Sequence, residues 1–149
     1  MDFDRDLLSR QQARELLEGA QRAFRELSRL PQEKLDRFAS AIAEAGERNA
    51  EPLGQLACEE TGFGNPQDKA EKNRFASRCV FDAVREMKTV GLLRREPGLW
   101  EIGVPVGVIA GIVPSTNPTS TVLYKSIIAL KAGCAIVFSP HPGAVNCTR

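Results

Sequence analysis

The length, composition and charge of the chain exclude several classes of function. It has 149 residues, of which 42% are hydrophobic and 26% charged, as is ordinary for a globular domain with a buried core. Its 20 Lys and Arg against 19 Asp and Glu give a net charge of +1, so charge provides no reason to expect nucleic-acid or membrane binding. The longest apolar run, residues 104–113, is far shorter than the roughly 20 residues that span a bilayer. Residues 1–10 lack the apolar segment of a secretory signal, and we therefore expect a cytoplasmic protein.

The cysteines show no metal or redox pattern. Cys58, Cys79, Cys134 and Cys147 form no CxxC pair and no spacing typical of metal ligands, so we predict no metal site. The first three lie in apolar helical or strand contexts, where a cysteine is usually a small buried hydrophobe. We expect Cys147, which lies in a polar context, to be exposed.

The first half of the chain is predicted to be helical. An amphipathic pattern predicts a helix over residues 4–27. A second helix is expected from Pro31 to Gly46, a third from residue 49 or 50 to residue 60, and a fourth from the start signal Asn65-Pro66 to about residue 88. The charges at 68–74 are expected to form a solvated face, because mixed signs at short spacing generate little net field.

After these helices the pattern changes to short strands. Residues 91–97 are predicted to be a polar connection, and residues 99–103 a short strand in which Trp100 packs under or between other elements. The run Val106–Val113 keeps no polar face, as expected of a strand covered on both sides in a parallel sheet. Asn117-Pro118 starts a helix that Gly133 ends, and residues 134–138 form the next strand.

Residues 106–139 therefore form a βαβ unit. Its two strands should end at residues 114–117 and 139–141, side by side and next to a helix N-terminus. Ligands bind at such edges of open α/β sheets. Because the chain has no GxGxxG loop, the spacing equally allows an ordinary sheet edge that binds no ligand. The predicted fold is α/β, with N-terminal helices leading into the first βαβ of an incomplete Rossmann-like parallel sheet. We expect a piece of a larger protein, because one crossover leaves an open apolar sheet edge.

Two strings near the end of the chain carry a specific resemblance. They are GVIAGIVPSTNPTSTVLYKSIIALKAG and AIVFSPHPGA, and they closely resemble the coenzyme A-acylating branch of the aldehyde dehydrogenase superfamily. The strings EETGFG, DKAEKNRFAS and MKTVG extend the resemblance over most of the chain. The discriminating strings are PSTNPTS and SPHP, because non-acylating members look like P-W-N-x-P and K-P-S at these places. The resemblance implies that residues 1–149 are the N-terminal part of the NAD-binding domain, with the catalytic domain absent.

The resemblance also implies a chemistry. In this branch a cysteine adds to an aldehyde, hydride passes to NAD, and coenzyme A takes the acyl group from the thioester. Asn117 is then the candidate oxyanion donor, a role that supplies roughly 3 kcal/mol of transition-state stabilisation. PSTN is one residue longer before its asparagine than PWN, so Thr116 is an alternative at that position. The residues themselves equally allow Asn117 to be only a helix N-cap.

The same resemblance implies which residues contact the cofactor. The nicotinamide side would be lined by Ile112, Val113, Pro114, Ser115 and Thr116, and the adenosine side by Ser139 and His141. Many relatives carry a ribose-binding lysine where this chain has Ser139. The catalytic cysteine and the glycine motif of the family lie beyond the last residue of this sequence, so we expect the chain alone to lack dehydrogenase activity.

Three functions remain open at this point. The first is an N-terminal fragment of an NAD-dependent, CoA-acylating aldehyde dehydrogenase that acts on a small aldehyde, without nucleic-acid or membrane partners. Its full-length relatives are expected to be homo-oligomers. The second is a fragment of a non-acylating aldehyde dehydrogenase. The third is a non-catalytic interaction protein that pairs its open sheet edge with a full-length subunit.

Overall fold

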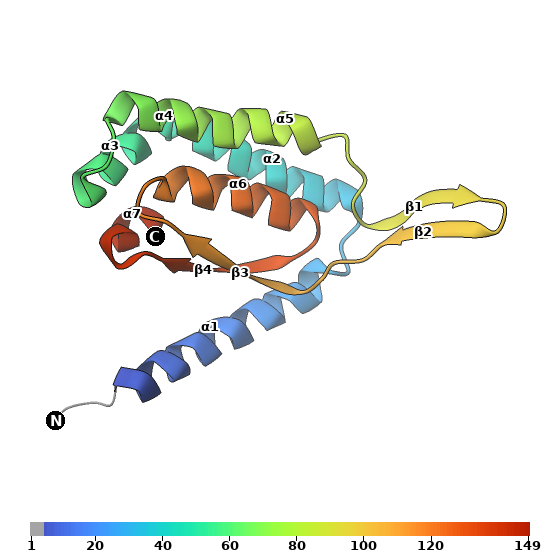
Figure 1. Ribbon diagram of the computed structural model, residues 1–149. Helices are drawn as coiled ribbons and strands as arrows, with labels where there is room; N and C mark the ends of the chain where they lie inside the picture. The colour runs from blue at the N-terminus through green and yellow to red at the C-terminus, as the bar shows by residue number, and fades with distance from the viewer. Residues whose placement is uncertain (1–4) are drawn as a thin grey trace.

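Helices stack on both faces of a small parallel sheet, and a hairpin projects from one side (Figure 1). The computed structural model describes residues 5–149, so Asp4 of the first predicted helix lies outside the described residues. In chain order the elements are α1 (Arg5–Leu27), α2 (Gln32–Arg48), α3 (Ala50–Thr61), α4 (Pro66–Arg74), the π-helical segment η1 (Phe75–Cys79), α5 (Val80–Val84), β1 (Gly91–Glu96), β2 (Leu99–Gly103), β3 (Val108–Val113), α6 (Pro118–Lys131), β4 (Ala135–Pro140), the 3₁₀ turn η2 (Pro142–Ala144) and α7 (Val145–Thr148).

The predicted helices of the first half are confirmed. The Asn65 side chain caps α4 by accepting from the Asp68 amide at 2.9 Å, and Pro66 occupies the first turn, where its missing N–H costs nothing. Helix α4, η1 and α5 follow one another without a break, and this helical segment ends at Val84, four residues before the predicted end. Among residues 5–149, no helix has the length and apolarity that a bilayer crossing requires.

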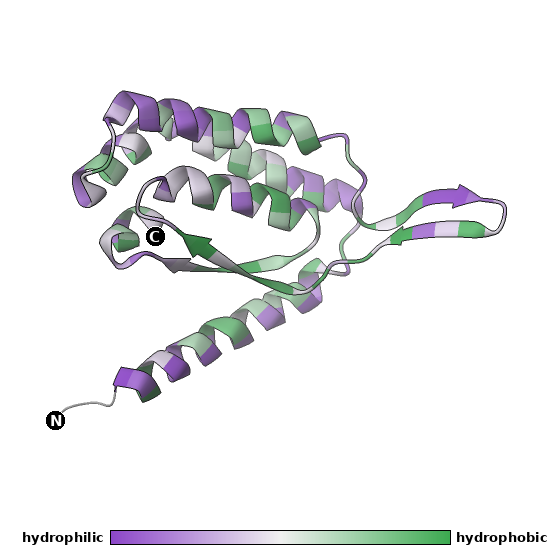
Figure 2. Cartoon of the chain, viewed as in Figure 1, coloured by the Kyte–Doolittle hydropathy of each residue, from purple (hydrophilic) through white to green (hydrophobic). Residues whose placement is uncertain are grey.

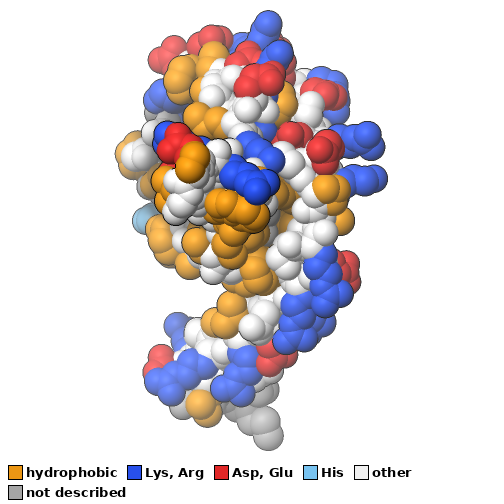
Figure 3. Space-filling view, turned by 90° about the vertical axis from the view of Figure 1, so that its right-hand side faces the viewer, with side chains coloured by type: hydrophobic (Ala, Val, Ile, Leu, Met, Phe, Trp, Pro, Cys, Tyr) orange, Lys and Arg blue, Asp and Glu red, His pale blue; other side chains and the backbone are white. Residues whose placement is uncertain are grey.

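The prediction of a polar connection over residues 91–97 is wrong. These residues form β1, which pairs antiparallel with the correctly predicted β2, and Gly98 turns the chain with a φ of 80°. Every residue of β1 is exposed, and its sequence shows no alternation of apolar and polar side chains that would predict a strand. The strand forms only through its pairing with β2. Trp100 is 57% exposed and stacks under the Arg95 guanidinium at 4.5 Å, instead of packing under other elements. Figure 3 views the molecule from this hairpin end, where basic and hydrophobic side chains are both exposed.

The predicted βαβ unit is confirmed, but its first strand begins at Val108, two residues after the predicted start, and its second strand ends at Pro140. Strands β3 and β4 pair in parallel from Val108 beside Ala135 to Val113 beside Pro140. Helix α6 covers one face of this pair, and α1 crosses the other (Figures 1 and 2). Cover on both faces, however, is incomplete at the end of β3, where Ile112 is 65% exposed while Val113 is buried. The uncovered side chain lies beside the turn into α6.

The burial of the cysteines differs from expectation at three of the four positions. Cys134 is buried as predicted, but Cys58 is only half-buried and Cys79 is exposed on the outer side of η1. Cys147 is buried, because α7 packs it against Ala57 of α3. Helical position alone did not decide these cases, since burial depends on which face another element covers.

Gly54 allows α3 and α4 to approach closely, and its substitution is expected to destabilise the chain. A Cβ at Gly54 would lie 2.8 Å from the Ala70 nitrogen and the Pro66 oxygen, both of them backbone atoms that cannot rotate away. We expect Gly54→Ala to lower the free energy of unfolding by about 1–3 kcal/mol in urea denaturation. In α1, a Cβ at Gly19 would meet nothing closer than 3.8 Å, so Gly19→Ala is the matched control. Equal effects of the two substitutions would contradict the close approach of α3 and α4.

Candidate functional site

The two polar segments expected at the ends of the strands lie side by side. Ile112 is the register partner of Ser139, and the His141 amide donates to the Val113 carbonyl at 2.9 Å. The turn from β3 into α6 and the segment after β4 therefore share the carboxyl edge of the sheet, next to the N-terminus of α6. This is the edge at which ligands bind in open α/β sheets.

The side chains at this edge divide into exposed and buried groups. Ile112 and Ser139 are both exposed, and because they are register partners they project from the same face of the sheet. Pro114, Thr116 and His141 are also exposed, and Ser115 is half-buried. Val113 projects into the core, so only its backbone is available to a ligand. An apolar side chain and a hydroxyl are therefore both accessible at this edge.

A groove of about 430 Å³ lies between α1 and the sheet. Leu16 and Leu17 of α1 form one wall, and Ala110, Val137 and Ser139 lie among the residues of the opposite wall. The groove is mostly apolar, and its lining includes Ser139 and Pro140 at the end of β4.

The Asn117 side chain does not cap α6. Asn117 occupies the N-cap position with φ −142° and ψ 59°, yet its side chain accepts no bond from the helix amides. Its Oδ1 instead accepts a hydrogen bond from Lys72 Nζ at 3.1 Å, across 45 residues of sequence. Within residues 5–149 its Nδ2 donates to no other group. The N-cap prediction is therefore correct for the backbone position and wrong for the side chain.

Lys69 holds the preceding residue of the turn. Its Nζ donates to the Thr116 carbonyl at 2.7 Å, and the lysine is only 4% exposed. Sequence reasoning missed Lys69 and Lys72, because both fall in a segment of mixed charges that was expected to be a solvated face. Their spacing of three residues, which places both on one side of α4, was the available signal.

The start of α6 and the end of β3 have further polar attachments. The buried Asn73 of α4 donates to the Ala50 carbonyl at 3.0 Å and accepts from the Thr119 hydroxyl at 2.8 Å. From α6, Lys125 Nζ donates to the Ile112 carbonyl at 2.7 Å. Buried polar groups that are fully paired fix the positions of their elements, so α3 and α4 hold the first turn of α6.

Cys147 is unsuited to act as a nucleophile. Burial raises the pKa of its thiol to about 12, and the neighbouring Glu60 carboxylate adds to the effect. The Glu60 carboxylate accepts from the amides of Asn146 at 2.9 Å and Cys147 at 2.6 Å, which lowers the pKa of Glu60. A thiol with so high a pKa is almost entirely protonated at neutral pH, whereas the thiolate is the reactive form.

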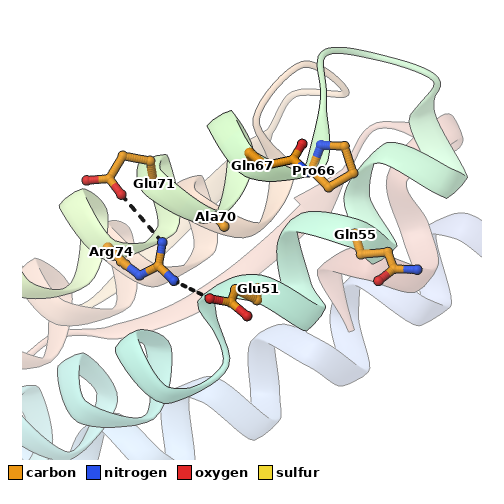
Figure 4. A pocket seen from close by; sticks show the side chains of 7 residues that line it. All are labelled: Glu51, Gln55, Pro66, Gln67, Ala70, Glu71 and Arg74. Carbon is orange, nitrogen blue, oxygen red and sulfur yellow. Dashed lines mark hydrogen bonds and ion pairs between the residues drawn. The ribbon is translucent and has the colours of Figure 1, made fainter.

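A second pocket, between α3 and α4, has a different character (Figure 4). It encloses about 470 Å³, and Arg74 projects into it. The Arg74 guanidinium contacts Glu51 at 2.7 Å and Glu71 at 3.4 Å, so its charge is already paired. None of the residues at the strand ends lines this pocket.

Both the sequence and the fold of this chain match known proteins. The profile of the aldehyde dehydrogenase family matches residues 5–148. The chain is 43% identical over 136 residues to the bifunctional aldehyde-alcohol dehydrogenase of Escherichia coli K12, an alignment that covers 90% of this chain. The crystal structure of an acetylating aldehyde dehydrogenase from Geobacillus thermoglucosidasius matches 97% of the chain, with a TM-score of 0.93 and 49% identity. A propionaldehyde dehydrogenase from Rhodopseudomonas palustris, solved with bound CoA and an acylated cysteine, matches 89% with a TM-score of 0.70 and 30% identity.

The chain spans only part of these proteins. It covers 15% of the E. coli enzyme, 32% of the Geobacillus chain and 30% of the Rhodopseudomonas chain. The family match nevertheless extends over almost all of the 149 residues, and the resemblance inferred from PSTNPTS and SPHP is confirmed. The chain belongs to the aldehyde dehydrogenase family.

Proposed function

We propose that the chain forms part of the NAD-binding domain of a CoA-acylating aldehyde dehydrogenase. This enzyme would convert an aldehyde, CoA and NAD⁺ to acyl-CoA and NADH. The observation that carries the proposal is the strand edge at which the PSTN turn and the SPH segment meet, in a chain whose relatives include acetylating enzymes. Because those relatives are acetylating, they favour this function over that of a non-acylating member.

The exposed residues of the edge have distinct proposed roles. NAD, when bound, accepts the hydride, and CoA accepts the acyl group. Ile112 and the Val113 backbone, followed by Pro114, Ser115 and Thr116, would contact the nicotinamide side. Ser139 and His141, across the parallel register, would contact the adenosine side. The serine hydroxyl would form the ribose contact in place of a lysine.

Asn117 is proposed to stabilise the oxyanion that forms when a thiolate adds to the aldehyde. Its Nδ2 amide group is a donor with no partner within residues 5–149, as an oxyanion site requires. The hydroxyl of the exposed Thr116 is the alternative donor, one residue earlier in the turn.

The chain by itself is expected to show no dehydrogenase activity. Its most buried thiols, Cys134 and Cys147, are inaccessible, and neither of the other two cysteines lies at the strand edge. The purified chain should produce no NADH absorbance from acetaldehyde, CoA and NAD⁺ above a blank without protein. Steady NADH formation that depends on all three substrates would overturn this expectation.

A chimera tests the proposed function directly. Residues 5–148 would replace the matching third of the Geobacillus enzyme, which is 49% identical over this segment. We expect a folded chimera that reduces NAD⁺ only when both aldehyde and CoA are present. A chimera that is folded by circular dichroism but forms no acyl-CoA would contradict the proposal, and activity without CoA would favour the non-acylating alternative.

The partners and location of the protein are proposed on similar grounds. We propose a cytoplasmic homo-oligomer with a small aldehyde as substrate and no nucleic-acid partner. In the β1–β2 hairpin, Trp100 and Ile102 are 57% and 60% exposed, and exposed apolar side chains of this kind suit a protein interface. The hairpin therefore supports the homo-oligomer and, equally, the alternative of a non-catalytic interaction protein. Sedimentation of the chain as a monomer at every concentration, without association with a full-length relative, would contradict the interaction protein.

A further inference from the structure

We propose that Lys72 is a positioning residue that orients the Asn117 amide so that its N–H groups face the reacting oxygen, while Lys69 holds the backbone beneath it. This inference rests on the proposed function of Asn117 as oxyanion donor. It concerns two lysines on α4 that lie outside the strand edge itself.

The chemistry of the pair fixes the orientation of the amide. A lysine ammonium carries three donors and no acceptor, whereas an asparagine amide offers one oxygen acceptor on one side and an NH₂ donor on the other. The atom 3.1 Å from Lys72 Nζ must therefore be Oδ1, and Nδ2 must project away from α4. Without Lys72 the amide is free to rotate by half a turn and present its oxygen, which repels an oxyanion.

Lys69 gives the same control over the main chain. Its ammonium is buried and donates to the Thr116 carbonyl at 2.7 Å, one peptide before Asn117. Helix α4, which carries both lysines, is itself attached to α6 through Asn73 and Thr119. The turn is thus held at a backbone atom and at a side-chain atom from one rigid helix.

The arrangement matters for catalysis because an oxyanion donor must be oriented before charge develops. Donors that are already in place require no reorganisation during the reaction, and this preorganisation accounts for most of their effect. This preorganisation increases kcat more than it changes substrate binding.

Steady-state kinetics of the chimera test the proposal. We expect Lys72→Met to lower kcat by about 10-fold to 100-fold with the KM for aldehyde changed less than about threefold, since the amide donor acts in the transition state. Lys72→Arg, which retains the charge and donors, should recover most of the loss. Lys34→Met removes an exposed lysine of α2 that makes no contact with this turn, and it should leave kcat unchanged.

A double substitution separates positioning from a structural role. On the Asn117→Ala background, Lys72→Met should lower kcat by less than about twofold, because the amide it orients is gone. A loss that persists in full on that background overturns the proposal. The proposal is also overturned if Asn117→Ala lowers kcat while Lys72→Met retains the wild-type kcat.

Nuclear magnetic resonance of the 149-residue chain provides a test without activity. The Asn117 side-chain NH₂ signals should shift in Lys72→Met and should match the wild type in Lys34→Met. Unchanged Asn117 signals in Lys72→Met would refute the orienting contact. Because this measurement needs no turnover, an inactive chimera would count against the proposed function and leave the Lys72 contact to be decided by the spectra.

Discussion

Replacing Asn117 by alanine is expected to lower kcat of the chimera by about 100-fold to 1,000-fold, as the loss of a single oxyanion donor does elsewhere. The KM for aldehyde should change little, because the amide acts on charge that exists only in the transition state. Initial rates of NADH formation at saturating CoA measure the effect. The fold should be retained, since the Asn117 side chain makes no bond to the helix amides.

One further variant, Thr116→Val, and the stability of Asn117→Ala distinguish the possible roles of this turn. If Asn117 were only an N-cap, Asn117→Ala would lower the free energy of unfolding by about 1 kcal/mol and leave kcat unchanged. If the Thr116 hydroxyl were the donor, the near-isosteric Thr116→Val would produce the loss of kcat and Asn117→Ala would not. A full loss in Asn117→Ala with a normal Thr116→Val assigns the role to Asn117.

Removing the carboxylate of Asp36 is expected to cause a large loss of stability. Lys131 is only 2% exposed, and its ammonium contacts Asp36 Oδ1 at 2.7 Å and the Arg85 carbonyl at 2.6 Å. Asp36→Ala leaves this buried charge without its counter-ion, which costs about 3–5 kcal/mol in fully buried pairs. The Asp36 side chain is 36% exposed, so solvent screens part of the effect and we expect about 3 kcal/mol.

Chemical denaturation of the chain measures this effect against two controls. Glu44→Ala removes a partner from the Arg48 contact, in which both side chains are more than 60% exposed, and should cost less than about 1 kcal/mol. Lys131→Met removes the buried charge itself and fills most of its volume, so it should cost less than Asp36→Ala. A loss for Asp36→Ala no greater than that for Glu44→Ala would contradict a stabilising role for the buried pair.

The sequence predicted those helices and strands that are marked by residues within or next to the element itself. Asn65-Pro66 and Asn117-Pro118 mark helix starts that the structure confirms, because a proline in the first turn lacks only an N–H that has no partner within the helix. The parallel pairing of β3 and β4 follows from one apolar strand, one helix and a second strand in succession. Strand β1 escaped prediction because its exposed charged residues resemble a loop until β2 pairs with them.

The sequence by itself determined the family of this protein and the two segments that meet at its strand edge. These properties follow from short strings and from the order of elements, which need no distant contact. Only the tertiary structure decided what surrounds the PSTN turn, because Lys69 and Lys72 reach it from more than 40 residues away. It also decided the burial of Cys147 and of Lys131, since burial depends on the elements that pack over a residue. The proposed site thus rests on a turn that the sequence identifies and on an orientation of Asn117 that α4 provides.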